Sequence, residues 1–171
     1  HEGGPVGAIA VTEPSTQKVV ITSVHIKHWE NWAIRILESE NVDILYNTIE
    51  ECGTYYYPDE QLPDHYSSAV LSLKNSTDLF VKGNYLKDLH NKFENIAQHH
   101  AFYMTRLGNS EICNNIVINA SGPPLKFRRS PTNHVYVHDN EFYYTGPSKQ
   151  LNLVQEGWIR YSGDPASGCP Y

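Results

Sequence analysis

The sequence predicts an all-β fold, a single-stranded parallel β-helix of about five to six coils with two long loops on one side. The first observation is an internal repeat, because the stretch Ala101–Tyr144 contains two consecutive copies of one unit. The second is an asparagine that recurs at the same place in each unit. The third is strand length, since the apolar segments are too short for a stable meander and lack Asn-Gly or Asp-Gly hairpin turns. Stacked coils solve this problem, because each strand then pairs with its equivalent in the next coil.

Each copy of the unit consists of a short apolar strand, a polar turn, a second strand, an asparagine and a third strand. The strands of the two copies are Phe102–Met104, Glu111–Cys113 and Asn115–Val117, then Leu125–Phe127, Val135–Val137 and Asn140–Phe142. In the second copy, the segment that follows Phe127 lengthens the first turn.

The same frame extends in both directions along the chain. An apolar residue lies three positions before each asparagine, namely Ile44, Val81, Ile112 and Val137. The first strands of two earlier coils end at Ile36 and Leu73, and an initial unit places strands at Ile9–Val11, Val19–Ile21 and Val24–Ile26. A last partial unit is expected around Trp158–Tyr161.

The recurring asparagines have a physical reason in such a fold. Asparagine tolerates the left-handed turn conformation, and its amide can bond to the amides above and below it in a ladder. The predicted ladder consists of Asn47, Asn84, Asn115 and Asn140. Val24 occupies the equivalent position of the first coil, so the ladder is expected to begin at Asn47.

At residues 7–146 the chain resembles the right-handed parallel β-helix proteins of the pectate-lyase-like superfamily. The resemblance depends on a repeated V-x-I-x-x-N-x-I pattern, as in Val42–Ile49. It implies a right-handed coil, in agreement with the usual hand of parallel crossovers. The family also implies polysaccharide lyase or epimerase activity, but the pattern itself is typical of the fold.

Composition indicates one domain over residues 1–171, with residues 146–171 as an irregular C-terminal segment or cap. The net charge of −6 argues against a nucleic-acid partner, which requires a basic face. No apolar run is long enough for a membrane span. The three cysteines show no CxxC spacing, so no metal site is expected.

Two insertions lengthen the coils at one corner and are expected to overhang one face. They are Gly53–Ser67 and Leu89–His100, and long loops on a regular scaffold are where function tends to lie. The first loop supplies aromatic and imidazole side chains suited to a carbohydrate chain, namely Tyr56, Tyr57, His65 and Tyr66.

The face beneath these loops is predicted from strand alternation, since the residues between two core positions point outward. One outward column is expected to contain Ala10, Arg35, Ser72, Tyr103 and Lys126, with Arg160 continuing it. A second is expected to contain Leu37, Lys74, Thr105 and Arg128. His100 lies at the loop end of the same strand as Tyr103.

This set of residues suggests β-elimination on an acidic polysaccharide. The reaction needs a cation at the C6 carboxylate, a base for the C5 proton and an acid for the leaving oxygen, and C5 epimerisation shares the first step. The predicted catalytic residues are Tyr103, Lys126, Arg128 and His100. The predicted substrate-binding residues are Arg35, Lys74 and Arg129 together with the four loop residues above. The expected location is secreted or at the cell surface.

Other interpretations remain open from the residues alone. The acidic residues of the first loop permit a hydrolase, or a calcium ion as the one cofactor considered, although no run of alternating acids supports calcium. The charges of the outward columns are equally compatible with a solvated sheet, and Tyr103 with ordinary strand propensity. A non-catalytic glycan-binding, tailspike-like or filament protein that self-associates through its solenoid ends is the main alternative.

Overall fold

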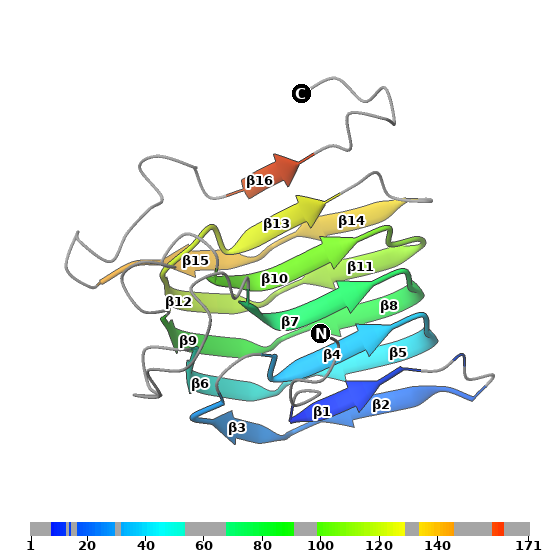
Figure 1. The fold of residues 1–171 in the computed structure, drawn as a ribbon, viewed down its shortest axis with the longest axis horizontal. Coiled ribbons are helices and arrows are strands. Elements are labelled where there is room, and N and C mark those ends of the chain that lie inside the picture. The colour runs from blue at the N-terminus through cyan, green and yellow to red at the C-terminus, as the bar shows by residue number, and fades with distance from the viewer. Residues whose placement is uncertain are drawn as a thin grey trace, which may run out of the picture.

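The computed structural model describes residues 8–12, 14, 17–29, 32–53, 68–90, 99–128, 134–145 and 159–162. Every regular element in these ranges is a β-strand, and all strand pairs are parallel. Most of the two predicted loops, residues 54–67 and 91–98, lies outside the described residues. The all-β parallel prediction is therefore confirmed (Figure 1).

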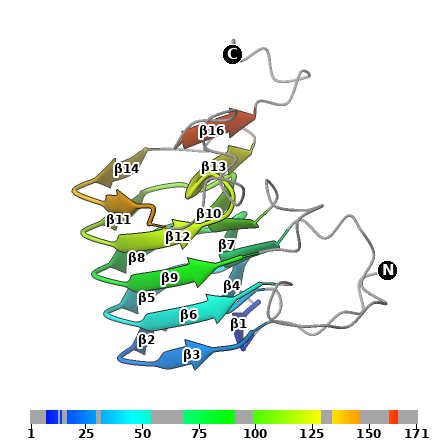
Figure 2. The ribbon, with the colours of Figure 1, turned by 90° about the vertical axis from the view of Figure 1, so that its left-hand side faces the viewer.

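The strands form three sheets, and each complete coil contributes one strand to each sheet (Figure 2). Sheet A consists of β1 (Ile9–Val11), β4 (Ile34–Leu37), β7 (Ser68–Lys74), β10 (His99–Thr105), β13 (Leu125–Arg128) and β16 (Ile159–Ser162). Sheet B consists of β2 (Val19–Thr22), β5 (Glu40–Leu45), β8 (Thr77–Lys82), β11 (Ser110–Cys113) and β14 (Val135–His138). Sheet C consists of β3 (His25–Lys27), β6 (Thr48–Cys52), β9 (Tyr85–Leu89), β12 (Ile116–Ala120) and β15 (Glu141–Tyr143). Five coils are complete, and β16 begins a sixth, as the sequence predicted.

The inward side chains fill the space between the sheets with aliphatic groups. Leu71, Leu73 and Phe102 of sheet A are fully buried, as are Ile44 of sheet B and Leu86 of sheet C. Equivalent positions in successive coils stack on one another, so each coil alone would leave an apolar interior open, and stability depends on the neighbours above and below.

The asparagine ladder is present in the predicted register. The side-chain amides of Asn47, Asn84 and Asn115 each donate to the Oδ1 atom of the next asparagine at 2.9 Å. Each amide also donates to a main-chain carbonyl of the preceding coil, for example Asn84 Nδ2 to Ile44 O at 2.9 Å. Val24 is the predicted break, and its main-chain N–H is capped by Asn47 Oδ1 at 3.0 Å.

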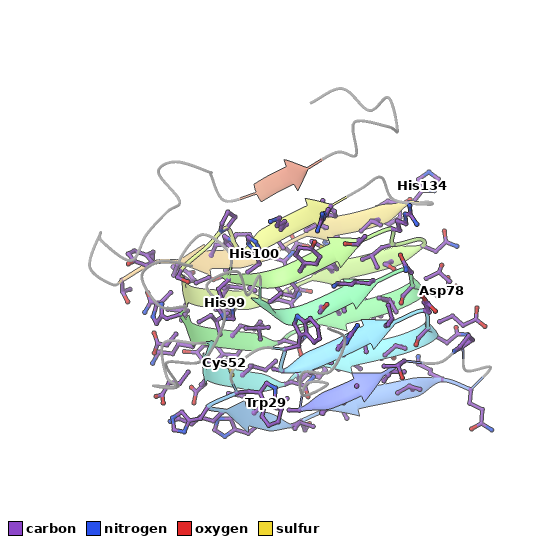
Figure 3. All side chains as sticks on the ribbon, viewed as in Figure 1. Trp29, Cys52, Asp78, His99, His100 and His134 are labelled. Atoms are coloured by element: carbon purple, nitrogen blue, oxygen red, sulfur yellow. The ribbon has the colours of Figure 1, made fainter. Side chains whose placement is uncertain are left out.

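The left-handed residue is not the ladder asparagine, contrary to the sequence-based expectation. It is the residue immediately before, as at Tyr46 with φ 53° and Asn114 with φ 53°. Among the described residues, the fourteen non-glycine residues with positive φ fall into four columns. They are Ser23, Tyr46, Asn114 and Asp139; His28, Glu51, Asp88 and Asn119; Glu38, Asn75 and Arg106; and Asn41, Asp78 and Asn109. Asp78 marks one of these corners in Figure 3. These left-handed positions recur at equivalent places in most of the coils, and Gly83 with φ 67° takes the third-coil place in the first column.

Replacing a central ladder residue should cost far more stability than replacing the last one. In Asn115→Ala, the N–H and Nδ2 groups of Asn84 lose their acceptor and the Val81 carbonyl loses a donor, all in a buried setting. We expect a loss of about 3–5 kcal/mol in the free energy of unfolding, measured by chemical denaturation. Asn140→Ala should cost about half as much, because Asn140 is half-buried and water can replace its bonds. Equal losses for the two variants would contradict a cooperative buried ladder.

Substitution of Gly83 tests the backbone geometry of the corner that precedes Asn84. The φ of Gly83 is +67°, and a Cβ atom there would lie 2.5 Å from Cδ1 of the Tyr46 ring in the preceding coil. Gly83→Ala should destabilise the protein by about 2–3 kcal/mol through this clash and the left-handed backbone. In a Tyr46→Ala background the same substitution should cost only the backbone part, about 1 kcal/mol. A cost that does not change with the Tyr46 ring removed would show that the ring does not lie over Gly83.

Candidate functional site

The outer face of sheet A carries the two predicted columns in the predicted register. Arg35 pairs with Ser72, Ser72 with Tyr103 and Tyr103 with Lys126 along one column. Ala10 is the first member of this column, and beyond Lys126 the main chain of β16 pairs with β13. The second column contains Leu37, Lys74, Thr105 and Arg128 in successive coils.

A third outward column lies nearer the start of these strands and was not predicted. Two consecutive residues enter the core in three successive coils, namely Ala33 and Ile34, Val70 and Leu71, and Ala101 and Phe102. This interrupts the alternation of the strand, so the residues just before each pair return to the outer side. They are Trp32, Ala69 and His100. The small side chain of Ala69 lines a depression in the surface beside the Trp32 ring.

The depression is a hollow of about 130 Å³ lined by Trp32, Ala69, Lys74, Tyr103 and Arg128. Its walls are aromatic rings that carry cations. The Arg35 guanidinium carbon lies 4.3 Å from the centre of the Trp32 ring, and Lys74 Nζ lies 5.4 Å from it. Such contacts hold a cation by the ring quadrupole and leave its charge uncompensated.

Tyr103 is the centre of the cluster. Arg128 Nη1 donates a hydrogen bond to the Tyr103 hydroxyl at 3.0 Å. Lys74 Nζ and Lys126 Nζ lie 5.2 Å and 5.6 Å from the centre of its ring. The structure therefore brings together four predicted residues of the site, Lys74, Tyr103, Lys126 and Arg128, around one phenol.

Two polar groups beneath this cluster are buried without a hydrogen-bond partner among the described residues. They are the Ser72 hydroxyl and Arg35 Nε. Ser72 is fully buried and stands between Arg35 and Tyr103 in the outward column. Buried polar groups normally have a partner, so their presence indicates a place where a ligand or a water molecule completes the bonding.

Electrostatics distinguish this face from the other two. In sheets B and C, several outward cations pair with carboxylates of the next coil, as in Lys18 with Asp43 at 2.7 Å and Lys27 with Glu51 at 3.2 Å, although Lys82 of sheet B lies 5.7 Å from the centre of the Phe80 ring. The outward positions of the described strands of sheet A contain no acidic residue. Arg35 and Lys74 form no ion pair with any carboxylate of the described ranges.

The Lys74 ammonium experiences this accumulation of charge directly. Burial lowers the pKa of Lys74 from its ordinary value of 10.5, and the nearby Arg35 and Arg128 charges lower it further. An anion bound in the hollow would oppose the effect of the neighbouring charges, because it compensates them.

His100 lies beside the cluster but is closed off from solvent. It is fully buried near the start of β10, next to His99 (Figure 3). Its Nδ1 atom is 2.8 Å from the carbonyl oxygen of Pro123, and its ring centre is 6.2 Å from that of Tyr103. A neutral His100 therefore donates from Nδ1, and its position suits support of the Tyr103 ring better than direct contact with a polymer.

Five predicted site residues lie outside the described residues, namely Tyr56, Tyr57, His65, Tyr66 and Arg129. Conversely, the sequence reasoning missed Trp32 and the role of Ser72. The sequence signal for Trp32 was the apolar pair that follows it, Ala33 and Ile34. When two successive residues both point into the core, the residue before them points outward.

A second and larger hollow of about 460 Å³ lies at the corner between sheets A and B. It is lined by Pro14, Glu38, Ser39, Glu40, Asn75, Ser76, Thr77 and Arg106. Its serines are already bonded to the main chain, for example Ser76 Oγ to Lys74 O at 2.7 Å. Its charged residues include two carboxylates, whereas the charged residues that line the hollow around Tyr103 are cations.

Comparison of the chain with family models, with curated proteins and with solved structures gave no significant match. Within the described part of the chain, no helix has the length and apolar character needed to cross a membrane.

The charge on Lys74 should cost the unliganded protein stability. Because its pKa is lowered on folding, the unfolded chain binds the proton more tightly, and stability rises as the pH increases from the lowered value toward 10.5. Lys74→Met removes the charge, so its melting temperature at neutral pH should exceed that of the wild type by about 1–3 °C. The variant should also lack the gain of stability in the alkaline window.

Lys82→Met is the matched control, because Lys82 lies on the outer face of sheet B. Thermal unfolding followed by circular dichroism between pH 7 and 10.5 tests both variants. An equal rise in melting temperature for Lys82→Met, or a decrease for Lys74→Met, would contradict the crowding of charge around Lys74.

Proposed function

We propose that the protein binds an acidic polysaccharide along the outer face of sheet A. The observation that carries this proposal is the accumulation of cations on sheet A, where Arg35, Lys74 and Lys126 lie against aromatic rings and no acidic residue occupies an outward position of the described strands. Like charges held close together without a counter-charge do not stabilise the fold. Their presence on this face therefore favours an anionic ligand.

The chemistry of the hollow fits a uronate unit. The guanidinium groups of Arg35 and Arg128 can each hold a carboxylate through two hydrogen bonds. The Trp32 ring provides an apolar surface for the face of a sugar ring, and the Tyr103 hydroxyl provides a hydrogen-bonding group at the wall of the hollow. A hollow of about 130 Å³ accommodates one charged unit, and the row of strands extends it to a chain.

A catalytic role by β-elimination or C5 epimerisation is the second candidate, and the contact between Arg128 and Tyr103 favours it. Because Arg128 donates to the phenol oxygen, the phenol's own proton is directed elsewhere and can be given to a leaving glycosidic oxygen. Lys74 releases its proton more readily than an ordinary lysine and can accept the C5 proton. In that step the C5–H bond and the C4–O bond break, a C4–C5 double bond forms, and the cations neutralise the carboxylate charge.

The proposal also includes the handedness of the coil and the family relationship of the chain. We infer a right-handed coil, because parallel crossovers within one sheet are almost always right-handed, and a kinship with the pectate-lyase-like superfamily. The coil length, the asparagine ladder and the three parallel sheets support this kinship. A polymer of this class is found outside cells, so a secreted or cell-surface location stays part of the proposal.

Binding is tested by affinity electrophoresis in gels that contain polygalacturonate, alginate or a neutral glucan. We expect retardation by at least one uronan and none by the glucan. Lys74→Met should weaken retardation about tenfold or more, because it removes one central charge of the hollow. Lys82→Met carries the same charge change on sheet B and should bind as the wild type does. Equal weakening by both variants would indicate attraction by net charge alone and overturn the proposed face.

Catalysis is tested separately on the polymers that bind. A lyase would produce an unsaturated sugar with strong ultraviolet absorbance, and an epimerase would change the uronate composition seen by NMR. Tyr103→Phe should abolish either signal by removing the phenol proton and should leave retardation within about twofold of the wild type. Retardation with no product from the wild-type protein would assign the face to binding alone.

A further inference from the structure

A second cluster of chemistry-bearing residues lies on the outer face of sheet B, remote from the cation cluster. Glu111 and Cys113 are two positions apart in β11 and therefore face the same side. His138 of β14 is the register partner of Cys113 in the next coil. Strands β11 and β14 are neighbours at the C-terminal end of the solenoid (Figure 2).

The three side chains converge on one point. Cys113 Sγ lies 3.3 Å from Glu111 Oε1, and His138 Nε2 lies 3.3 Å from the same oxygen. All three atoms lie within 4.8 Å of one another. A tetrahedral zinc ion at its usual bond lengths would separate sulfur, nitrogen and oxygen ligands by roughly 3.3–3.6 Å. Two of the three edges already have this length.

The surroundings of the histidine match those of a metal ligand. His138 Nδ1 lies 2.8 Å from Asp139 Oδ2, and a carboxylate at that position fixes the ring with Nε2 toward the other two groups. A carboxylate behind a ligating histidine is a common feature of protein zinc sites. The orientation of His138 is thus set by a residue outside the triangle.

Access to the triangle is one-sided. The Glu111 and His138 side chains are 43% and 48% exposed, whereas Cys113 is 2% exposed and forms the floor. An ion could enter from solvent between the two exposed groups, with the thiolate beneath it and a water molecule completing four ligands.

We propose that Glu111, Cys113 and His138 form a binding site for zinc. The thiolate and imidazole select a borderline-soft ion over calcium or magnesium, which prefer oxygen ligands. The bound ion would join the fourth and fifth coils. The site is independent of the polysaccharide face, because its residues lie on sheet B.

The chain contains a built-in comparison for this geometry. His25 and Glu50 of sheet C also meet across adjacent coils, with His25 Nε2 3.2 Å from Glu50 Oε2, but no thiol accompanies them. If an imidazole and a carboxylate alone were enough, both places would bind the ion. The proposal assigns the difference to Cys113.

The test is a titration of the reduced full-length protein with Co²⁺ alone as a spectroscopic substitute for Zn²⁺. We expect a thiolate-to-cobalt charge-transfer band in the near ultraviolet, visible bands of tetrahedral intensity, and displacement of both by one equivalent of Zn²⁺. Cys113→Ser should abolish the charge-transfer band, and His138→Gln should weaken Co²⁺ binding about 100-fold. Asp139→Asn should weaken it about tenfold.

Two control variants test whether the Co²⁺ signal depends specifically on Cys113 and His138. Cys169→Ser removes the cysteine outside the described residues, and His25→Gln removes the imidazole of the comparison pair; both should keep the full band. The His138→Gln change is at a half-exposed position, so its fold, checked by circular dichroism, should be intact even if Cys113→Ser unfolds. Absence of the band in the wild type, or its loss in Cys169→Ser in place of Cys113→Ser, would overturn the site.

Discussion

The buried asparagine ladder is the constraint from which the rest of the molecule follows. Each side-chain amide of the inner ladder is bonded to the next asparagine and to the main chain of the preceding coil, so one coil cannot shift along another without leaving several buried groups unsatisfied. A shift by one residue would also turn every apolar side chain of a strand outward. The ladder and the core therefore specify the same register, and the register decides which side chains meet on the outer faces.

This explains why so much could be predicted from the sequence. Once Asn47, Asn84, Asn115 and Asn140 are aligned, the alternation of the strands places Arg35, Ser72 and Tyr103 in one column without further information. What failed were features set by departures from regularity. The left-handed residue is one position earlier than expected, immediately before the ladder asparagine. Trp32 and His100 reach the outer side only because two core residues follow each other.

The three outer faces of the solenoid differ in side-chain chemistry although they share one backbone scaffold. Sheets B and C carry acidic side chains beside their cations and pair several of them across coils, as in Lys18 with Asp43 and Lys27 with Glu51. Sheet A gathers cations on aromatic rings and keeps a serine hydroxyl buried beneath them. Because the strands share the same geometry, this difference originates in side-chain choice alone. The alternation of side chains along each strand predicts which residues form the columns. The ligand depends on the chemistry of those side chains, which the repeat does not specify.

The ladder also gives the solenoid an electrical polarity. From Asn47 to Asn115, every Oδ1 is directed toward the preceding coil and one N–H of each side-chain amide toward the following coil, while the other N–H donates to a main-chain carbonyl of the preceding coil. The side-chain carbonyl dipoles therefore add along the axis. The negative end is at Asn47, which caps the Val24 N–H, and at the other end Asn140 turns its second N–H back to the carbonyl of His138. The two ends of the ladder therefore differ chemically. At one end Asn47 Oδ1 already accepts a hydrogen bond, and at the other an Asn140 N–H donates to a carbonyl of its own coil.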